Sequence, residues 1–134
     1  MKTRQQDGFT LLEVLVVLVI LTLMLGLVIA HGPMHSARLD TEATARELAS
    51  ALRLARGRAI AEDRPVAVAM ASTVYRIDGS PPHPVPHGVT LAGNAAIRFA
   101  PDGSSSGGTV MVEATNARVT IAVDWLTGRV RTLP

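Results

Sequence analysis

The chain has 134 residues, a formal net charge of +2 and no cysteine. This length allows one modest domain, and the lack of cysteine excludes disulfides, thiolate metal sites and cysteine nucleophiles. Twelve arginines against one lysine permit an anionic partner. Eleven acidic residues are interspersed among them, and an aromatic content of 3% is low for a protein that stacks nucleic-acid bases.

The first predicted element is an apolar helix over residues 9–30, with the sequence FTLLEVLVVLVILTLMLGLVIA. About 20 apolar residues span a bilayer. Lys2 and Arg4 precede the run and the next basic residue is Arg38, so the positive-inside rule predicts a single span with a cytoplasmic N-terminus. Glu13 is the only charge in the run. A carboxylate in hydrocarbon costs roughly 2.5–3.5 kcal/mol, so Glu13 needs a partner.

Three interpretations of this segment compete. A secretory signal peptide has an apolar core of about 7–15 residues, which is shorter than this run. A plain signal anchor would require Glu13 to snorkel to the interface. The third interpretation, which we favour, is proteolytic processing between Gly8 and Phe9 on the cytoplasmic side of the membrane.

The segment MKTRQQDG-FTLLEVLVVLVIL closely resembles the class III signal of type IV pilins and type II secretion pseudopilins. That signal is a short basic leader ending in glycine, followed by Phe-Thr-Leu-[Leu/Ile]-Glu, here Gly8, Phe9, Thr10, Leu11, Leu12 and Glu13. The resemblance implies that a prepilin peptidase cuts after Gly8 and N-methylates Phe9. It also implies that Glu13 pairs with the Phe9 amine of a neighbouring subunit during assembly; the alternatives are a pair within one chain or a neutral carboxyl group.

The next element is an amphipathic helix over residues 40–61, whose narrow apolar stripe suits packing on a sheet. We expect Asp40 or Thr41 to cap this helix, with Glu42 in its first turn and Pro65 ending it. The stripe consists of Ala45, Leu48, Leu52, Ala55 and Ala59.

The remaining sequence favours short antiparallel strands separated by turns rich in Gly, Pro and Ser. The expected strands are 66–70, 74–77, 89–91, 97–99, 110–112, 119–125 and a return strand from 129. Six or seven such strands packed on one helix predict an α+β fold. We expect Gly26 and Gly32-Pro33 to interrupt the apolar helix, and we divide the chain into leader 1–8, transmembrane and assembly segment 9–31, amphipathic periplasmic helix 32–64 and periplasmic β domain 65–134.

Two histidine pairs have a four-residue spacing, which favours metal binding only on a helix. We interpret His31 and His35 as an interfacial flank, and His83 and His87 as part of a Pro-rich loop. The serines 104–106 have no accompanying base or oxyanion motif. The sequence therefore predicts no catalytic residue, no metal and no cofactor.

One loop matches the spacing of an EF-hand calcium site, through Asp102, Ser104, Ser106, Gly107 and Glu113. Two serines in place of acids weaken this pattern, and residues 109–112 favour a strand. We interpret the segment as a Gly/Ser turn between strands, with calcium binding as the alternative.

The segments FAPDGSSSGG and RVTIAVDWLTGRVR resemble the C-terminal half of the GspH/FimT pseudopilin family. The resemblance implies a type IV pilin-like fold and the H-type minor pseudopilin of a type II secretion system, near the tip of the periplasmic pseudopilus that drives export of folded proteins. Such a subunit lies in the bacterial inner membrane before it enters the pseudopilus. Its implied partners are other major and minor pseudopilins, the prepilin peptidase, the inner-membrane assembly platform and membrane lipid.

The alternative function is a FimT-type minor type IV pilin that binds DNA for uptake. That branch has a C-terminal Gly-Arg-x-Arg motif, which Gly128-Arg129-Val130-Arg131 matches. Because Arg129 and Arg131 alternate with Val130, we expect both to point outward from one face and to contact phosphates. The competing explanation is protection of an edge strand by charge.

Overall fold

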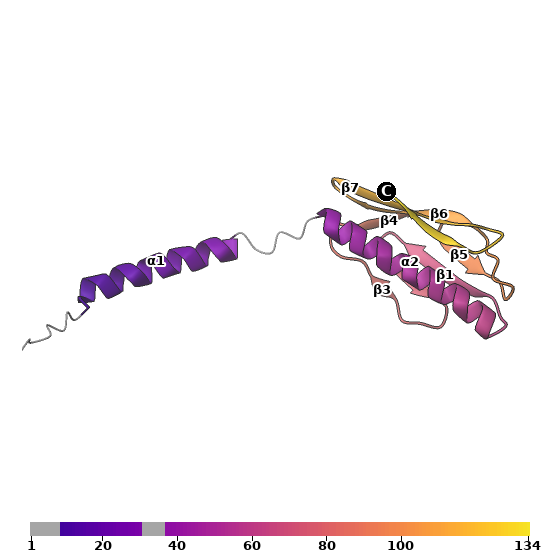
Figure 1. The fold of residues 1–134 in the computed structure, drawn as a ribbon, viewed down its shortest axis with the longest axis horizontal. Coiled ribbons are helices and arrows are strands. Elements are labelled where there is room, and N and C mark those ends of the chain that lie inside the picture. The colour runs from indigo at the N-terminus through magenta and orange to yellow at the C-terminus, as the bar shows by residue number, and fades with distance from the viewer. Residues whose placement is uncertain (1–8, 31–36) are drawn as a thin grey trace, which may run out of the picture. The chain divides into compact units, whose positions relative to one another are not determined.

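The computed structural model describes residues 9–30 and 37–134. They belong to two compact units, Met1–Met34 and His35–Pro134, which are described separately (Figure 1). The first unit contains helix α1, Leu11–Ala30. The helix runs through Gly26 without a break, so the predicted interruption there is wrong; Gly32-Pro33 lies outside the described residues.

In the described part of the chain, α1 is the one helix that is long and apolar enough to cross a bilayer. Its segment Leu11–Val28 has a mean hydropathy of 3.0, and none of it is buried within its own unit. A core helix of a soluble domain would hide its apolar surface by packing. Here that surface is open all round, as membrane insertion or packing against other subunits requires.

Helix α2, Ala37–Ala61, begins three residues before the predicted start. Asp40 lies in its first turn, and the Thr41 hydroxyl donates to the Ala37 carbonyl at 2.6 Å. The predicted cap at Asp40 or Thr41 is therefore wrong. Two ion pairs on the helix surface stabilise this first part of α2. The Glu42 carboxylate pairs with Arg38 at 3.0 Å and with Arg46 at 3.3 Å.

The C-terminal end of α2 is set by a left-handed residue. Asp63 has φ of 48°, and the Arg64 N–H donates to the Ala59 carbonyl at 3.3 Å. This is the Schellman pattern of a helix end. The helix has thus already ended when the chain reaches Pro65, which contributes less than the sequence suggested.

Eight strands follow in the described part of the second unit, and every pairing is antiparallel. They are β1 (Val66–Ala71), β2 (Val74–Ile77), β3 (His83–Pro84), β4 (Thr90–Gly93), β5 (Ala96–Phe99), β6 (Gly108–Ala114), β7 (Ala117–Val123) and β8 (Val130–Leu133). They form two four-stranded sheets, in the orders β3-β2-β1-β5 and β4-β6-β7-β8. The α+β prediction is confirmed. The short strand β3 and the division into two sheets were not predicted.

Helix α2 lies along the strands and packs against both sheets (Figure 1). All five residues of the predicted stripe are buried, together with Thr41, Thr44 and Ala49. Opposite them, both sheets contribute apolar side chains to one core, and the largest that are fully buried are Phe99, Ile97, Ile121, Val66, Val68, Val110 and Val112. Every residue of this core lies within the second unit.

Candidate functional site

The start of α1 carries a hydrogen-bonded cap. Thr10 immediately precedes the helix, and its hydroxyl oxygen accepts from the Glu13 N–H at 3.2 Å. The Thr10 carbonyl accepts from the same N–H at 3.0 Å. Thr-x-x-Glu is the sequence pattern of a capping box. The pattern is visible in the sequence but was not predicted, and it gives the Glu13 backbone a local role beside the assembly role expected of its side chain.

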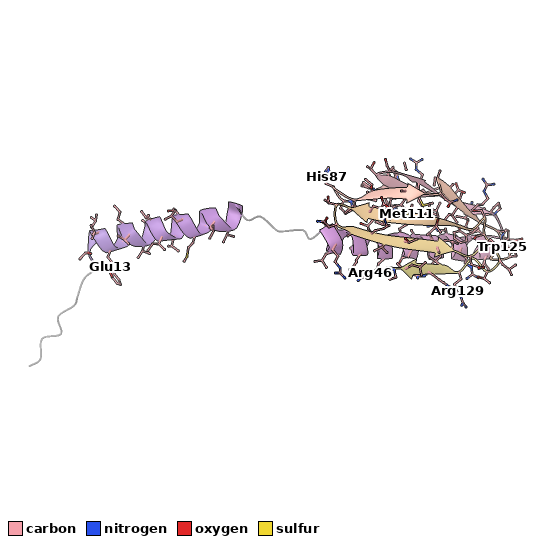
Figure 2. The ribbon with its side chains drawn as sticks, turned by 90° about the horizontal axis from the view of Figure 1, so that it is seen from above. Glu13, Arg46, His87, Met111, Trp125 and Arg129 are labelled. Carbon is pink, nitrogen blue, oxygen red and sulfur yellow. The ribbon has the colours of Figure 1, made fainter. Side chains whose placement is uncertain are left out.

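The Glu13 carboxylate lies in the first turn of α1 (Figure 2). An acid at this position is stabilised by the free N–H groups and the positive end of the helix dipole. Glu13 is exposed and forms no ion pair with any residue that the structure describes. Phe9, just before the cap, is 83% exposed. Gly8 lies outside the described residues, so the predicted Gly8–Phe9 cleavage site stays a prediction.

The second candidate region is the turn between β7 and β8. Asp124 organises it, because its Oδ1 atom accepts from the Leu126 N–H at 3.1 Å, the Thr127 N–H at 2.8 Å and the Thr127 hydroxyl at 2.9 Å. The bonds from the Thr127 backbone and hydroxyl are the main causes that hold the Asp124 pKa below its usual value. β7 ends at Val123, so the prediction that Trp125 belongs to that strand is wrong. Trp125 and Leu126 instead project from the turn and are 67% and 63% exposed.

Helix α2 fixes this turn through Arg56. Its Nε atom donates to the Gly103 carbonyl at 3.0 Å. Gly128 lies against the same atoms: a Cβ there would lie 2.2 Å from the Gly103 oxygen and 2.8 Å from Arg56 Nε. With φ of 62°, Gly128 also has a backbone conformation that favours glycine. No sequence pattern indicated this contact between residues far apart in the chain.

Arg129 and Arg131 are both exposed, whereas Val130 between them is 8% exposed. The outward direction expected for the two arginines is confirmed, although β8 begins at Val130 and not at Arg129. Neither arginine forms an ion pair with the residues that the structure describes, and the same is true of Arg53 and Arg56 on α2.

Arg129 borders two surface depressions. One, of about 250 Å³, is lined by Arg53, Arg56, Thr127, Gly128, Arg129 and Val130. The other, of about 500 Å³, has Trp125, Arg129 and Arg131 among its lining residues. Trp125 lies at the opposite end of the domain from His87 (Figure 2). The turn thus displays apolar and basic side chains together at one end of the domain.

The calcium alternative does not fit the structure. Glu113 lies in β6 and pairs with Arg118 at 2.8 Å. The Asp102 carboxylate accepts from the Ser104 N–H at 2.9 Å and the Ser104 hydroxyl at 2.6 Å, closing a local turn. The predicted turn between strands is confirmed. Elsewhere, the His83 ring stacks on Tyr75 with centroids 5.2 Å apart. Among the described residues, no three His, Asp or Glu side chains are grouped to hold a metal ion.

Comparisons with known proteins give the following similarities. Residues 3–29 match the prokaryotic N-terminal methylation motif. No curated protein matches the chain. Similar solved structures are the type IV minor pilin FimU of Pseudomonas aeruginosa PAO1 (TM-score 0.59, 17% identity, 69% of this chain and 87% of that chain covered) and the minor pseudopilin EpsH from the Type 2 Secretion System of Vibrio cholerae (TM-score 0.61, 11% identity, 70% and 96% covered).

Identities this low establish the pilin-like fold alone. The stronger similarity is to the family described as Type II transport protein GspH, which residues 44–127 match. This match covers α2 from residue 44 to its C-terminal end and the strands β1 to β7. It agrees with the resemblance seen in the sequence. Because it extends over more than half of the chain, the protein belongs to the GspH family of type II transport proteins.

Proposed function

We propose that this chain is a minor pseudopilin of a type II secretion system, a structural subunit near the tip of the periplasmic pseudopilus. The observation that carries the proposal is the GspH family match over residues 44–127, joined in the same chain to an N-terminal methylation motif. The open apolar surface of α1 supports it, because this helix needs either lipid or neighbouring helices around it. The subunit has no catalytic role and contributes packing to the fibre.

In this proposal α1 holds the subunit in the inner membrane, with the leader 1–8 in the cytoplasm and residues 32–134 in the periplasm. A prepilin peptidase removes the leader and methylates the new N-terminus at Phe9. The assembly platform then moves the subunit from lipid into the fibre, where it contacts other pseudopilins. Lys2 and Arg4 on the cytoplasmic side support this orientation.

Glu13 has a defined part in this process. Cleavage creates a cationic amine at Phe9, and opposite charges attract strongly where the dielectric constant is low. The Glu13 carboxylate is unpaired among the described residues and exposed on α1, so it is available to the Phe9 amine of a neighbouring subunit. Pairing offsets the penalty of roughly 2.5–3.5 kcal/mol for a carboxylate in hydrocarbon, which favours the assembled state.

The structure offers a matched pair of variants for this role. Glu13→Ala removes the charge but keeps the N–H that bonds to Thr10, whereas Thr10→Ala removes the hydroxyl acceptor but keeps the charge. We expect Glu13→Ala to reach the membrane at normal levels and to be depleted at least about tenfold from fibres isolated from the cell envelope, because it removes the partner of the Phe9 amine. Thr10→Ala should enter fibres nearly normally. Equal incorporation of Glu13→Ala and wild type would refute the assembly role.

The function itself is tested by deleting the gene in its own host. The proposal expects folded exoproteins to accumulate in the periplasm, and expects the wild-type gene to restore their release. Normal release, together with a loss of DNA uptake, would instead favour the second candidate.

That second candidate is a FimT-type minor type IV pilin that binds DNA. Arg129 and Arg131 favour it, because they are exposed on the same side of Val130 and unpaired among the described residues. Phosphate contacts would give binding that weakens steeply with salt and is independent of sequence.

Binding of a short DNA duplex to residues 35–134 over a range of salt concentrations tests this candidate. Arg129→Ala with Arg131→Ala should abolish binding, whereas the exposed Arg76 on β2 provides a control for loss of one positive charge. Absence of binding by the wild-type fragment at low salt would refute the DNA candidate. Strong binding that depends on the two arginines would refute a purely secretory function.

A further inference from the structure

We propose that the exposed end of the domain around the β7–β8 turn docks an acidic surface of another pilin-like subunit. This inference rests on the proposed function and names a partner surface within it. The basic turn surface, as we call it, consists of Arg53, Arg56, Trp125, Leu126, Arg129 and Arg131. It brings together α2, the turn and β8, and Arg129 borders both of its depressions.

The basic turn surface contains four arginines, and Asp124, which interacts electrostatically with Arg131, lines its larger depression. Elsewhere in the described part of the chain some arginines pair with acids, as in Arg38–Glu42, Arg64–Asp78 and Arg118–Glu113. None of the four arginines of the basic turn surface forms an ion pair there.

Arg58, Arg76 and Arg98 form no ion pair with the described residues either, so what sets the basic turn surface apart is that three of its arginines line one depression. This smaller depression has no acidic lining residue. Guanidinium groups bind carboxylates through paired N–H donors, so this depression suits acidic side chains.

Asp124 lies in the turn, but its carboxylate is not the acidic group that binds these arginines. Its Oδ1 atom already accepts three hydrogen bonds from Leu126 and Thr127. Its charge therefore shapes the turn, and the guanidinium groups around it keep donors for an external partner.

The apolar part of the surface is held in place before any partner binds. The Asp124 bonds fix the backbone of Leu126, and the Trp125 carbonyl accepts from the Ser105 N–H at 2.8 Å. Beneath Trp125 lies Gly107, where a Cβ would come within 2.9 Å of the tryptophan Cβ. An exposed aromatic side chain on a rigid turn loses little conformational entropy on binding. Trp and Arg are also the residues most enriched among those that dominate protein–protein binding energy.

These features favour a protein partner over nucleic acid. Trp125 by itself offers a ring on which a base can stack, but Leu126 beside it is exposed, offers no such ring and extends the apolar area. A protein surface can bury both side chains while its carboxylates meet the surrounding arginines. Trp125 and Arg129 of the basic turn surface lie at the end of the domain away from the start of α2 (Figure 2).

Site-specific photo-cross-linking in the native host tests this inference. The full chain carries p-benzoylphenylalanine at position 126, leaving Trp125 intact, and fibres isolated from the cell envelope after irradiation are analysed by mass spectrometry. We expect a cross-link to an Asp- or Glu-containing peptide of a different pilin-like subunit. The same cross-linker at position 87, at the other end of the domain, should not capture that peptide.

Charge reversal provides the second arm. Arg53→Glu with Arg129→Glu should lower the yield of the position-126 cross-link about tenfold, whereas Arg76→Glu, on β2, should leave it unchanged. Arg56 is not altered, because its bond to Gly103 is structural. If the double variant fails to accumulate, the wild-type cross-link is compared in permeabilised cells at low and high salt, and an unchanged yield overturns the inference.

The outcomes separate this inference from the function on which it rests. Three results refute the docking surface and leave the pseudopilin function standing. In each of them the chain is present in the isolated fibres, but position 126 captures no partner, captures a second copy of the chain, or captures nuclease-sensitive DNA. If the chain is absent from fibres and exoprotein release is normal without it, both fail. If position 126 cross-links to another pilin-like subunit but the yield is unchanged by Arg53→Glu with Arg129→Glu, the proposal that the partner surface is acidic is refuted.

Discussion

The Nε atom of Arg56 donates a hydrogen bond to the carbonyl oxygen of Gly103 at 3.0 Å, joining residues 47 positions apart. This bond ties α2 to the turn after β5, and Gly128 of the β7–β8 turn packs directly on both partners. One arginine thus connects the helix to the two turns that shape the basic end of the domain. The position of Arg129, which follows Gly128, depends on this contact.

Gly128→Ala should destabilise residues 35–134 by about 2–4 kcal/mol, because a Cβ would collide with the Gly103 carbonyl and strain the backbone. Gly79→Ala is the matched control. Gly79 has a similar φ of 70° but no atom within 4 Å of the added Cβ, so only the conformational strain of about 1–2 kcal/mol remains. Chemical denaturation measures both. Equal losses would show that the close packing around Arg56 is unimportant.

Thr44 and Thr41 give a second matched pair. Both are fully buried on α2. The Thr41 hydroxyl donates to the Ala37 carbonyl, whereas the Thr44 hydroxyl has no hydrogen-bond partner among the residues that the structure describes. Thr44→Val should raise the free energy of unfolding by about 1 kcal/mol, because it removes a buried unsatisfied group. Thr41→Val should lower it by a similar amount. Destabilisation by Thr44→Val would indicate that its hydroxyl is bonded in solution.

Asp124 should make the β7–β8 turn sensitive to acid. Its hydrogen bonds lower the pKa in the folded state, so the carboxylate stabilises the fold above the unfolded value of about 3.9, and this contribution is lost as the pH falls through the folded pKa. Asp124→Asn keeps an Oδ1 acceptor but does not titrate. Unfolding measured from pH 6 to pH 2 should therefore show a smaller loss of stability in the variant. Identical pH profiles would contradict this role of Asp124.

The apolar stripe of α2 and most of the strands could be predicted from the sequence, because burial on one face imposes a period that can be read directly. Ala45 to Ala59 and the alternation of Val119, Ile121 and Val123 are examples. The prediction failed where local geometry ends an element. Trp125 continues the alternation in sequence, but three hydrogen bonds to Asp124 turn the chain before the strand reaches it.

In the candidate sites too, features that follow a repeating pattern could be predicted, and features that depend on tertiary contacts could not. The outward direction of Arg129 and Arg131 follows from strand alternation and was predicted. The neighbourhood of Arg129 was not, because Arg53 and Arg56 come from α2 and approach it only through tertiary packing. The Thr10–Glu13 cap has the sequence pattern Thr-x-x-Glu and could have been predicted. It was not, because Glu13 was explained by its role in assembly alone. The cap uses the backbone N–H of Glu13, so the Glu13 carboxylate remains available to an external partner.

The central claim is that this chain is processed at Gly8–Phe9 and built into a secretion fibre. Mass spectrometry of the chain in fibres isolated from the cell envelope of its own host tests it most directly. The account predicts fibre-associated protein whose first residue is Phe9 with a methylated amine. A chain that begins at Met1, one cut after the apolar helix near His31, or absence of the chain from the fibres would contradict it.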